Sequence, residues 1–130
     1  MQLYFHKISL IVVLFLIATN SFSQSCEPYG TYIGESGSSE TINSAQGFSG
    51  SAPLTVNFVA NPTVNLPNGT HFEWHFFEQN NRRNAFLVRY ETNTQYTFTT
   101  AGSFQIYLYE VLGSDTVNVY VPITVSISES

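Results

Sequence analysis

The 130-residue sequence contains a single cysteine, Cys26, and this scarcity limits how the chain is held together. One cysteine cannot close a disulfide within the chain, and it cannot build a zinc site from several thiolates. The stability of the fold therefore has to come mainly from the burial of apolar side chains.

Basic residues are also few, because four Lys and Arg stand against nine Asp and Glu and give a formal net charge of −5. A nucleic-acid partner requires a basic face, and so does electrostatic docking on an anionic membrane. The composition argues against both kinds of partner. Aromatic residues are abundant instead, at 15% of the chain against 10% charged residues. This composition favours an all-β fold, and the length allows one domain.

Long hydrophobic runs are absent apart from Ile8–Ala18, which is shorter than the roughly 20 residues that cross a bilayer. This run follows a short basic start and precedes small residues, which is the pattern of a secretory signal peptide. Ser21 and Ser23 suit the small positions before a cleavage site. We therefore predict a signal peptide over residues 1–23, cleavage before Gln24, no transmembrane span in the mature chain, and a secreted or cell-surface location.

Cys26 lies just past the predicted cleavage site. One interpretation is a lipidation site, with the signal peptide removed directly before the cysteine. Ser23 stands three positions earlier, where a lipidated cysteine has a Leu-like residue, so this pattern is incomplete. The other interpretation is a free thiol on a mobile N-terminal tail.

The mature chain divides into two parts. Residues 24–41 are rich in Gly and Ser and show no period of 2 or 3.6, which predicts a flexible N-terminal segment. Over residues 42–128, apolar and polar residues alternate in short runs between turns, which predicts about seven strands. This pattern indicates an antiparallel β-sandwich of the immunoglobulin type. In the last strand, apolar residues occupy alternate positions from Val117 to Ile127, and Pro122 indicates an edge or a bulge.

Burial of one face of each strand is the predicted driving force of folding. Trp74 is the largest apolar side chain, and its place in mid-strand between two phenylalanines puts it between the sheets. The predicted structural core consists of Trp74, Phe58, Phe72, Phe76, Phe98, Phe104, Ile106 and Leu108.

Three stretches resemble the PKD domain, an immunoglobulin-like module of surface and secreted proteins. Ser51–Asn61 is similar to its Ala-Pro-Leu-Thr-Val strand, Phe72–Phe76 to its central Trp-x-Phe strand, and Tyr96–Leu108 to its Tyr-x-Phe…Gly segment. The order and spacing match over residues 42–127. The Gly-Asp-Gly turn of the family is replaced here by a longer strand and an Asn/Arg loop, so no role is carried over from that turn.

This variant of the PKD pattern, in which the Gly-Asp-Gly turn is replaced, resembles a subgroup in surface proteins of gliding-type Gram-negative bacteria. In that subgroup the domain precedes a C-terminal sorting or gliding-associated module. The resemblance implies a non-catalytic structural or adhesive module outside the cell. It also implies that the partners are a surface protein, a glycan or neighbouring modules of a longer surface protein. Val125–Ser130 is similar to the link into such a module, which implies a truncated or split form of a longer protein.

A candidate ligand-binding surface lies opposite the core. Tyr107 and Tyr109 point away from the core residues of their strand, and Phe77 points away from Trp74. With His75 these side chains form an aromatic strip. The strip is a platform for sugars or for a partner, or it covers the outer sheet face. A carbohydrate-binding module that uses these rings is therefore the alternative function.

Catalytic, metal and cofactor sites are not indicated. The chain has no nucleophile motif and no paired carboxylates, so we predict no catalytic residues. His71, Glu73 and His75 share one side of a strand, but the two histidines are roughly 13 Å apart, too far for one metal ion. Calcium requires several carboxylates, and the mature chain has one Asp, Asp115. We expect neither a metal nor a cofactor.

Overall fold

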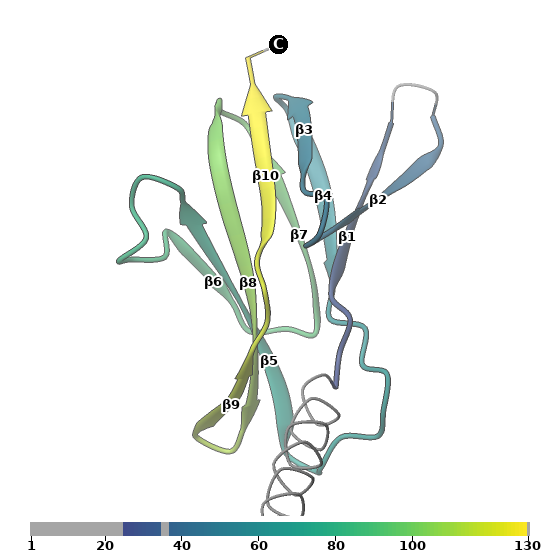
Figure 1. Ribbon diagram of the computed structural model, residues 1–130, viewed down its shortest axis with the longest axis vertical. Coiled ribbons are helices and arrows are strands. Elements are labelled where there is room, and N and C mark those ends of the chain that lie inside the picture. The colour runs from purple at the N-terminus through teal and green to yellow at the C-terminus, as the bar shows by residue number, and fades with distance from the viewer. Residues whose placement is uncertain (1–24, 35–36, 130) are drawn as a thin grey trace, which may run out of the picture.

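Figure 1 shows the computed structural model, which describes residues 25–34 and 37–129. These residues form ten β-strands in two sheets and contain no helix. The described part of the chain therefore has no helix of the length and apolarity that a membrane crossing requires. The predicted signal peptide, residues 1–23, lies outside the described residues.

The smaller sheet has the strand order β2-β1-β4-β7, and its strands pair antiparallel. Its members are β1 (Tyr29–Ile33), β2 (Ser39–Asn43), β4 (Leu54–Val59) and β7 (Asn93–Phe98). β4 turns Val56 and Phe58 towards the larger sheet, and both side chains are fully buried. This face supplies one wall of the core.

The larger sheet has the strand order β3-β10-β8-β5-β6, with β9 pairing to one end of β8. Its members are β3 (Phe48–Ser51), β5 (Thr70–Glu78), β6 (Leu87–Arg89), β8 (Gly102–Leu112), β9 (Asp115–Val119) and β10 (Ile123–Ser128). β5 and β8 pair antiparallel along the whole of β5, with Trp74 opposite Leu108. Gly113, with a φ of +65°, makes the tight turn from β8 to β9, a conformation that glycine adopts without steric cost.

Aromatic rings of both sheets meet in the space between them. The ring centroid of Phe58 on β4 lies 5.6 Å from those of Trp74 and Phe76 on β5. The indole N–H of Trp74 donates a hydrogen bond to the carbonyl oxygen of Thr92 over 3.1 Å, so the buried indole keeps a polar partner. Every side chain of the predicted core is buried: Trp74, Phe58, Phe72, Phe76, Phe98, Phe104, Ile106 and Leu108.

The alternation of apolar and polar residues in the sequence accounts for the main strands. Along β8, buried side chains alternate with partly buried ones, as expected where one face of a strand lies on the core. β5 shows the same alternation over its central residues. The predicted all-β, sandwich-like character of the chain is confirmed.

The N-terminal segment differs from the prediction of a flexible stretch over residues 24–41. β1 and the first residues of β2 fall within it, and β1 pairs with both β2 and β4. Ahead of β1, the N–H of Glu27 donates to the carbonyl oxygen of Asn61 (3.1 Å), and that of Thr63 donates to Ser25 (2.9 Å). These partners lie far apart in the sequence, so a local pattern does not reveal them. The β domain therefore begins ahead of its predicted boundary.

β3 is a further strand that the sequence pattern does not predict. It pairs with β10 in parallel, with Phe48 opposite Val125, so the larger sheet is mixed instead of purely antiparallel. β1, β3 and the division of the predicted last strand into two raise the number of described strands to ten, above the predicted count of about seven.

The predicted last strand is divided into β9 and β10. Val119 lies opposite Tyr109, and Ile123 lies opposite Ile106. The last strand therefore advances by four residues over an interval in which β8 advances by three. One extra residue on one strand turns the side chains that follow to the other face of the sheet. Pro122 lies in this interval, between β9 and β10. Proline has no N–H to contribute to the ladder, which is consistent with an interruption at this place.

This interruption corrects the prediction that alternate residues from Val117 to Ile127 share one face. The side chains of Val117, Val119 and Val121 are 46%, 51% and 66% exposed. The buried members of the set are Ile123, Val125 and Ile127. The prediction is therefore wrong for the three residues before the interruption and correct for the three after it.

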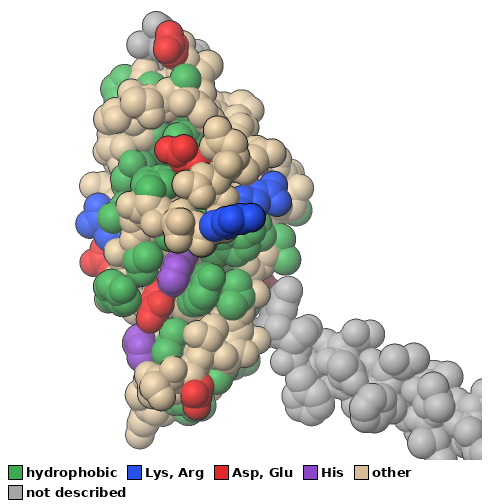
Figure 2. All heavy atoms as spheres, turned by 90° about the vertical axis from the view of Figure 1, so that its left-hand side faces the viewer, with side chains coloured by type: hydrophobic (Ala, Val, Ile, Leu, Met, Phe, Trp, Pro, Cys, Tyr) green, Lys and Arg blue, Asp and Glu red, His purple; other side chains and the backbone are tan. Residues whose placement is uncertain are grey.

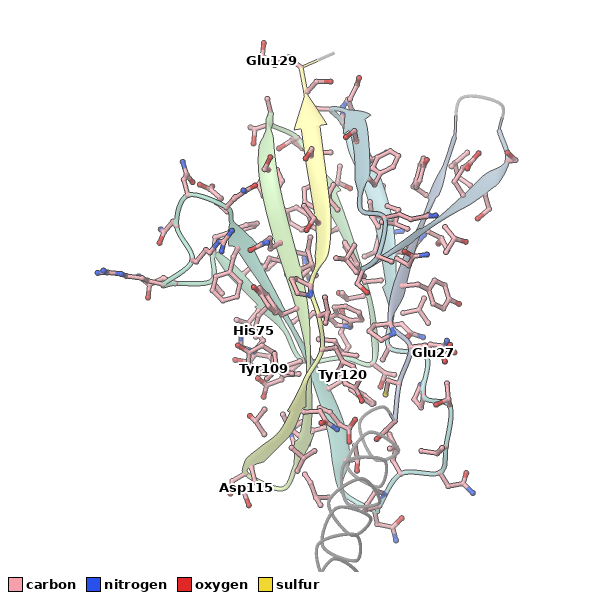
Figure 3. All side chains as sticks on the ribbon, in the orientation of Figure 1. Glu27, His75, Tyr109, Asp115, Tyr120 and Glu129 are labelled. Carbon is pink, nitrogen blue, oxygen red and sulfur yellow. The ribbon has the colours of Figure 1, made fainter. Side chains whose placement is uncertain are left out.

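The two ends of the described chain lie far apart along the long axis of the molecule. In Figure 3, Glu129 is labelled at one end of the two-sheet body, Asp115 at the other, and Glu27 lies between them at the side of the body. Figure 1 shows β1 leading away from the first described residues and β10 running to the opposite end. Part of the length of the body thus separates the ends of the described chain.

Candidate functional site

Aromatic side chains gather on the face of the larger sheet that points away from the smaller one. β5 and β8 place His75 opposite Tyr107, and alternate residues on each strand point to the same face. Phe77 and Tyr109 are the next residues along this face. These four partly exposed side chains are the outer-face strip. The structure thus brings together the residues that the sequence pattern assigned to one face.

The rings of the outer-face strip pack on one another. His75 and Tyr109 are stacked, with ring centroids 3.8 Å apart and planes 18° apart. Phe77 and Tyr107 meet edge to face at 5.5 Å. Both contacts run diagonally across the β5–β8 pair, which is the usual reach of large side chains on a sheet. Figure 3 shows His75 and Tyr109 together on the side of the sheet away from Tyr120.

This packing changes what the strip can bind. A sugar stacks on a free aromatic face, whereas the face of His75 and the face of Tyr109 are turned towards each other. The near-parallel ring of Phe77, 6.5 Å from His75, extends the same row. The strip therefore offers mainly ring edges and polar atoms to a ligand, which suits a protein surface better than a sugar ring.

Glu73 adds a negative charge to the strip. One of its carboxylate oxygens accepts a hydrogen bond from Nε2 of His75 over 2.9 Å. Figure 2 shows histidine side chains among hydrophobic side chains on this side of the molecule, with acidic groups near them. The strip thus combines aromatic rings with one carboxylate–imidazole pair, and Figure 2 shows basic side chains on the same side of the molecule.

His71 does not join the pair formed by Glu73 and His75. Its Nδ1 lies 3.3 Å from the carbonyl oxygen of Gly69, which accepts a hydrogen bond from it. Within residues 25–34 and 37–129, no three His, Cys, Asp or Glu side chains are grouped so that they could hold a metal ion.

A buried polar cluster, which the sequence interpretation missed, lies inside the sandwich. The side chain of Glu110 is 4% exposed, and its Oε1 accepts a hydrogen bond from the hydroxyl group of Tyr120 over 2.7 Å. The thiol of Cys26 lies 3.9 Å from the same oxygen. Glu110 occupies the same alternate positions of β8 as the core residues Ile106 and Leu108, and that spacing was the available signal.

Burial governs the protonation of this cluster. Burial raises the pKa of the Cys26 thiol above its ordinary value. Burial, and then the hydrogen bond to Glu110, raise the pKa of Tyr120 far above its ordinary value. Both groups therefore stay protonated and donate to the carboxyl group, so the cluster joins the N-terminal segment to β8.

The position of Cys26 differs from the prediction of a thiol on a mobile tail. Its side chain is 1% exposed and packs in the core. The bridge between Cys26 and Pro62 holds the backbone at this position. The free thiol of Cys26 is therefore part of the core.

A cavity of about 500 Å³ lies between the end of β5 and the start of β8. Its lining consists of residues 78–80 and 100–104. Glu78 is the acidic side chain in this lining, which has neither a histidine nor a cysteine. The lining therefore lacks the paired acid and base, or nucleophile and base, that hydrolytic chemistry uses.

Comparisons of the chain with protein-family models, with curated proteins and with solved structures find no match. The motifs that resemble the PKD domain therefore remain the basis of an expectation about the family. Function has to be argued from the geometry of the sandwich and its outer face.

Proposed function

We propose that this chain is a non-catalytic structural or adhesive module of a secreted or cell-surface protein, with an immunoglobulin-like sandwich of the PKD type. The module spaces or displays neighbouring modules and contacts a protein or a glycan through its outer surface. It works outside the cell, after removal of residues 1–23.

The observation that carries this proposal is the separation of the two ends of the described chain. Glu129 lies at one end of the sandwich, and Glu27 lies beside the sheets, partway towards the other end. The strands next to these ends are anchored by pairing, because β1 lies between β2 and β4, and β10 lies between β3 and β8. With residues 1–23 removed, a rigid body that is joined to a neighbouring module beyond β10 displays its outer face in a fixed orientation.

The outer-face strip supports a contact with protein. Interfaces are enriched in Tyr and Phe, and their amphipathic side chains combine contact area with polar edges. Tyr107 and Tyr109 are partly exposed in the strip, next to the Glu73–His75 pair. Carbohydrate binding by the same rings is the alternative, and it requires the stacked rings to separate.

A cell-binding assay tests the proposal. The purified exported chain is added to intact cells of the producing species from which this gene has been deleted. We expect saturable binding that is lost when surface proteins are digested with protease beforehand. Loss of binding after periodate oxidation of surface glycans would indicate the carbohydrate alternative. A lack of saturable binding would contradict an adhesive role.

A glycan array separates the two kinds of partner directly. We expect no specific glycan binding by the exported chain. Binding that is abolished by Tyr107→Ala, and retained by Tyr90→Ala, would favour the carbohydrate-binding function instead. Tyr90 is a suitable control because its side chain is 74% exposed and lies outside the strip.

A further inference from the structure

The basic side chains of the described residues all come from one short segment. Arg82 and Arg83 lie in the loop that joins β5 to β6, and Arg89 is the last residue of β6. Residues 25–34 and 37–129 contain no further Lys or Arg, and the whole chain carries a net charge of −5. Positive charge is therefore confined to one place on an otherwise acidic protein. We call residues 79–86 the arginine loop.

The larger sheet holds both ends of the arginine loop. At its start, the N–H of Gln79 donates to the carbonyl oxygen of Ser103 on β8 over 2.9 Å. At its end, the N–H of Phe86 donates to the carbonyl oxygen of Phe76 on β5, also over 2.9 Å. Figure 1 shows this loop on the side of the larger sheet that points away from β1 and β4. The loop therefore projects from a fixed base on the outer side of the sandwich.

The arginine loop adjoins the outer-face strip. Phe77 of the strip comes two residues before the loop, and Val88 follows two residues after it. Val88 lies opposite His75 across the β5–β6 pair, and opposite residues of such a pair share one face of the sheet. Figure 2, which looks at this side of the molecule, shows basic side chains together with histidine and hydrophobic side chains. Aromatic rings and guanidinium groups therefore lie on the same side of the protein.

The guanidinium groups of Arg82 and Arg83 have no acidic partner within the described part of the chain. Both side chains are exposed, and no ion pair among residues 25–34 and 37–129 includes an arginine. The acidic side chains of β5 are engaged elsewhere. Glu73 pairs with His75, whereas Glu78 occupies a core-side position of the strand and lines the cavity at its end. The loop therefore offers two unpaired positive charges.

We propose that the arginine loop and the outer-face strip form one docking surface for an acidic segment of a partner protein. This inference rests on the proposed contact with protein and adds the chemistry of the partner. A guanidinium group holds a carboxylate through two parallel hydrogen bonds. The ring edges of Tyr107 and Tyr109 contact apolar side chains that stand between the carboxylates. Arg and Tyr are among the residues that contribute most to the affinity of protein interfaces.

The local charges favour an acidic partner in spite of the net charge of the chain. At physiological ionic strength, exposed charges interact over about 8 Å, so distant acidic groups are screened. Asp115 and Glu129 lie at opposite ends of the body in Figure 3, and Glu110 is buried. A carboxylate that approaches the arginine loop therefore experiences mainly the charges of Arg82 and Arg83. Such local complementarity sets the specificity and the rate of association.

A protein segment fits this surface better than an acidic polysaccharide, although both carry carboxylates. The faces of His75 and Tyr109 are turned towards each other, so a sugar ring finds no free aromatic face there. A peptide carries apolar side chains that pack against ring edges. The partner is therefore inferred to be a protein.

An NMR titration of the isotope-labelled exported chain with a random copolymer of glutamate and tyrosine tests this inference without cells. We expect the largest amide shifts in the arginine loop and along the outer-face strip, and weaker binding at high salt. The double variant Arg82→Gln/Arg83→Gln should weaken binding by about tenfold, because charge-assisted hydrogen bonds are lost. Tyr107→Ala should also weaken it, with the salt dependence unchanged.

The double variant Asn65→Asp/Asn68→Asp is the matched control. It lowers the net charge by the same amount, at two exposed positions of the β4–β5 loop, which Figure 1 shows on the other side of the molecule. This control should bind the copolymer almost as the native chain does. Equal weakening by the two double variants would overturn the inference, because it would mean that only the net charge matters.

Three further results would overturn the inference. These are a native chain that does not bind the copolymer, binding that Tyr107→Ala leaves unchanged, and polygalacturonate that binds more tightly than the copolymer. The cell-binding assay keeps the two proposals apart. Cell binding that Arg82→Gln/Arg83→Gln retains in full would overturn this inference alone. Copolymer binding without cell binding would support the docking surface and contradict the adhesive role.

Discussion

At the scale of single residues, the fold depends most on Trp74. Its side chain is fully buried, touches Phe58 of the opposite sheet and donates its N–H to Thr92. The sequence allowed this placement to be predicted, because Trp74 alternates with polar residues in mid-strand. The hydrogen bond to Thr92 could not be predicted, because it joins segments that meet only when the chain folds.

Replacing Trp74 with alanine should lower the free energy of unfolding by about 3–5 kcal/mol, because it leaves a large cavity between the sheets. Such a loss is a large share of the roughly 5–15 kcal/mol that stabilises a domain of this size. Urea unfolding followed by circular dichroism measures the change. Tyr107→Ala on the outer face is the matched aromatic control and should cost clearly less. Equal losses for the two variants would contradict the burial of Trp74.

The cluster of Cys26, Glu110 and Tyr120 should make stability depend on alkaline pH. The pKa values of Cys26 and Tyr120 are raised in the folded chain, so the folded state holds these protons more tightly than the unfolded state. Their contribution is therefore complete below the ordinary pKa values of 9.0 and 10.0, and it is lost as the pH rises above them. Urea unfolding between pH 7 and pH 11 should show a plateau followed by a decline.

The variant Tyr120→Phe isolates the contribution of Tyr120 to this pH dependence of stability. The variant should be less stable at neutral pH by about 1–3 kcal/mol, because the buried carboxyl group of Glu110 loses its closest donor. Above the ordinary pKa of tyrosine, its stability should fall less steeply with pH than that of the native chain. Parallel curves for the two proteins would show that Tyr120 does not cause the decline.

At the scale of strands, local alternation predicts the elements whose pattern is set by the core. β4, β5 and β8 were predictable because apolar residues on one side of each strand pack between the sheets. β1 and β3 were not predictable, because Gly30 or Gly50 interrupts their short sequences. Both strands exist through pairing with β4 or β10, partners that lie far along the chain.

The last strand shows the limit of reading periodicity alone. Valines at alternate positions on both sides of Pro122 look like one face, yet the extra residue turns the first group outward. Only Pro122 itself signalled the interruption. The partner strand β8 decides the register. A second irregularity adds one residue on β9, because Asn118 lies opposite Glu110 while Thr116 lies opposite Val111.

Two valines, one on each side of Pro122, test whether the side chains change from the exposed face to the core face at this proline. Val121→Thr should change the free energy of unfolding by no more than about 0.5 kcal/mol, because the side chain is exposed. Val125→Thr should cost about 1–3 kcal/mol, because it places a hydroxyl group in the core. Urea unfolding of both variants gives the comparison. Equal costs would mean that the two valines share one environment.

At the scale of the whole molecule, the sequence supported prediction of the class and the core, and of which side chains share the outer face. Tyr107, Tyr109 and Phe77 were placed together from the alternation of β5 and β8 alone. The stacking of His75 on Tyr109 was out of reach, because it depends on the diagonal register of the pair and on side-chain conformations. That stacking is the reason why we propose a protein partner ahead of a sugar.

The proposed function places this sandwich outside the cell, and the mass of the intact protein recovered from the producing cells tests that claim most directly. We predict that the chain outside the cytoplasm has the mass of residues 24–130, with no lipid attached to Cys26. A chain with the mass of all 130 residues, found inside the cytoplasm, would contradict the claim.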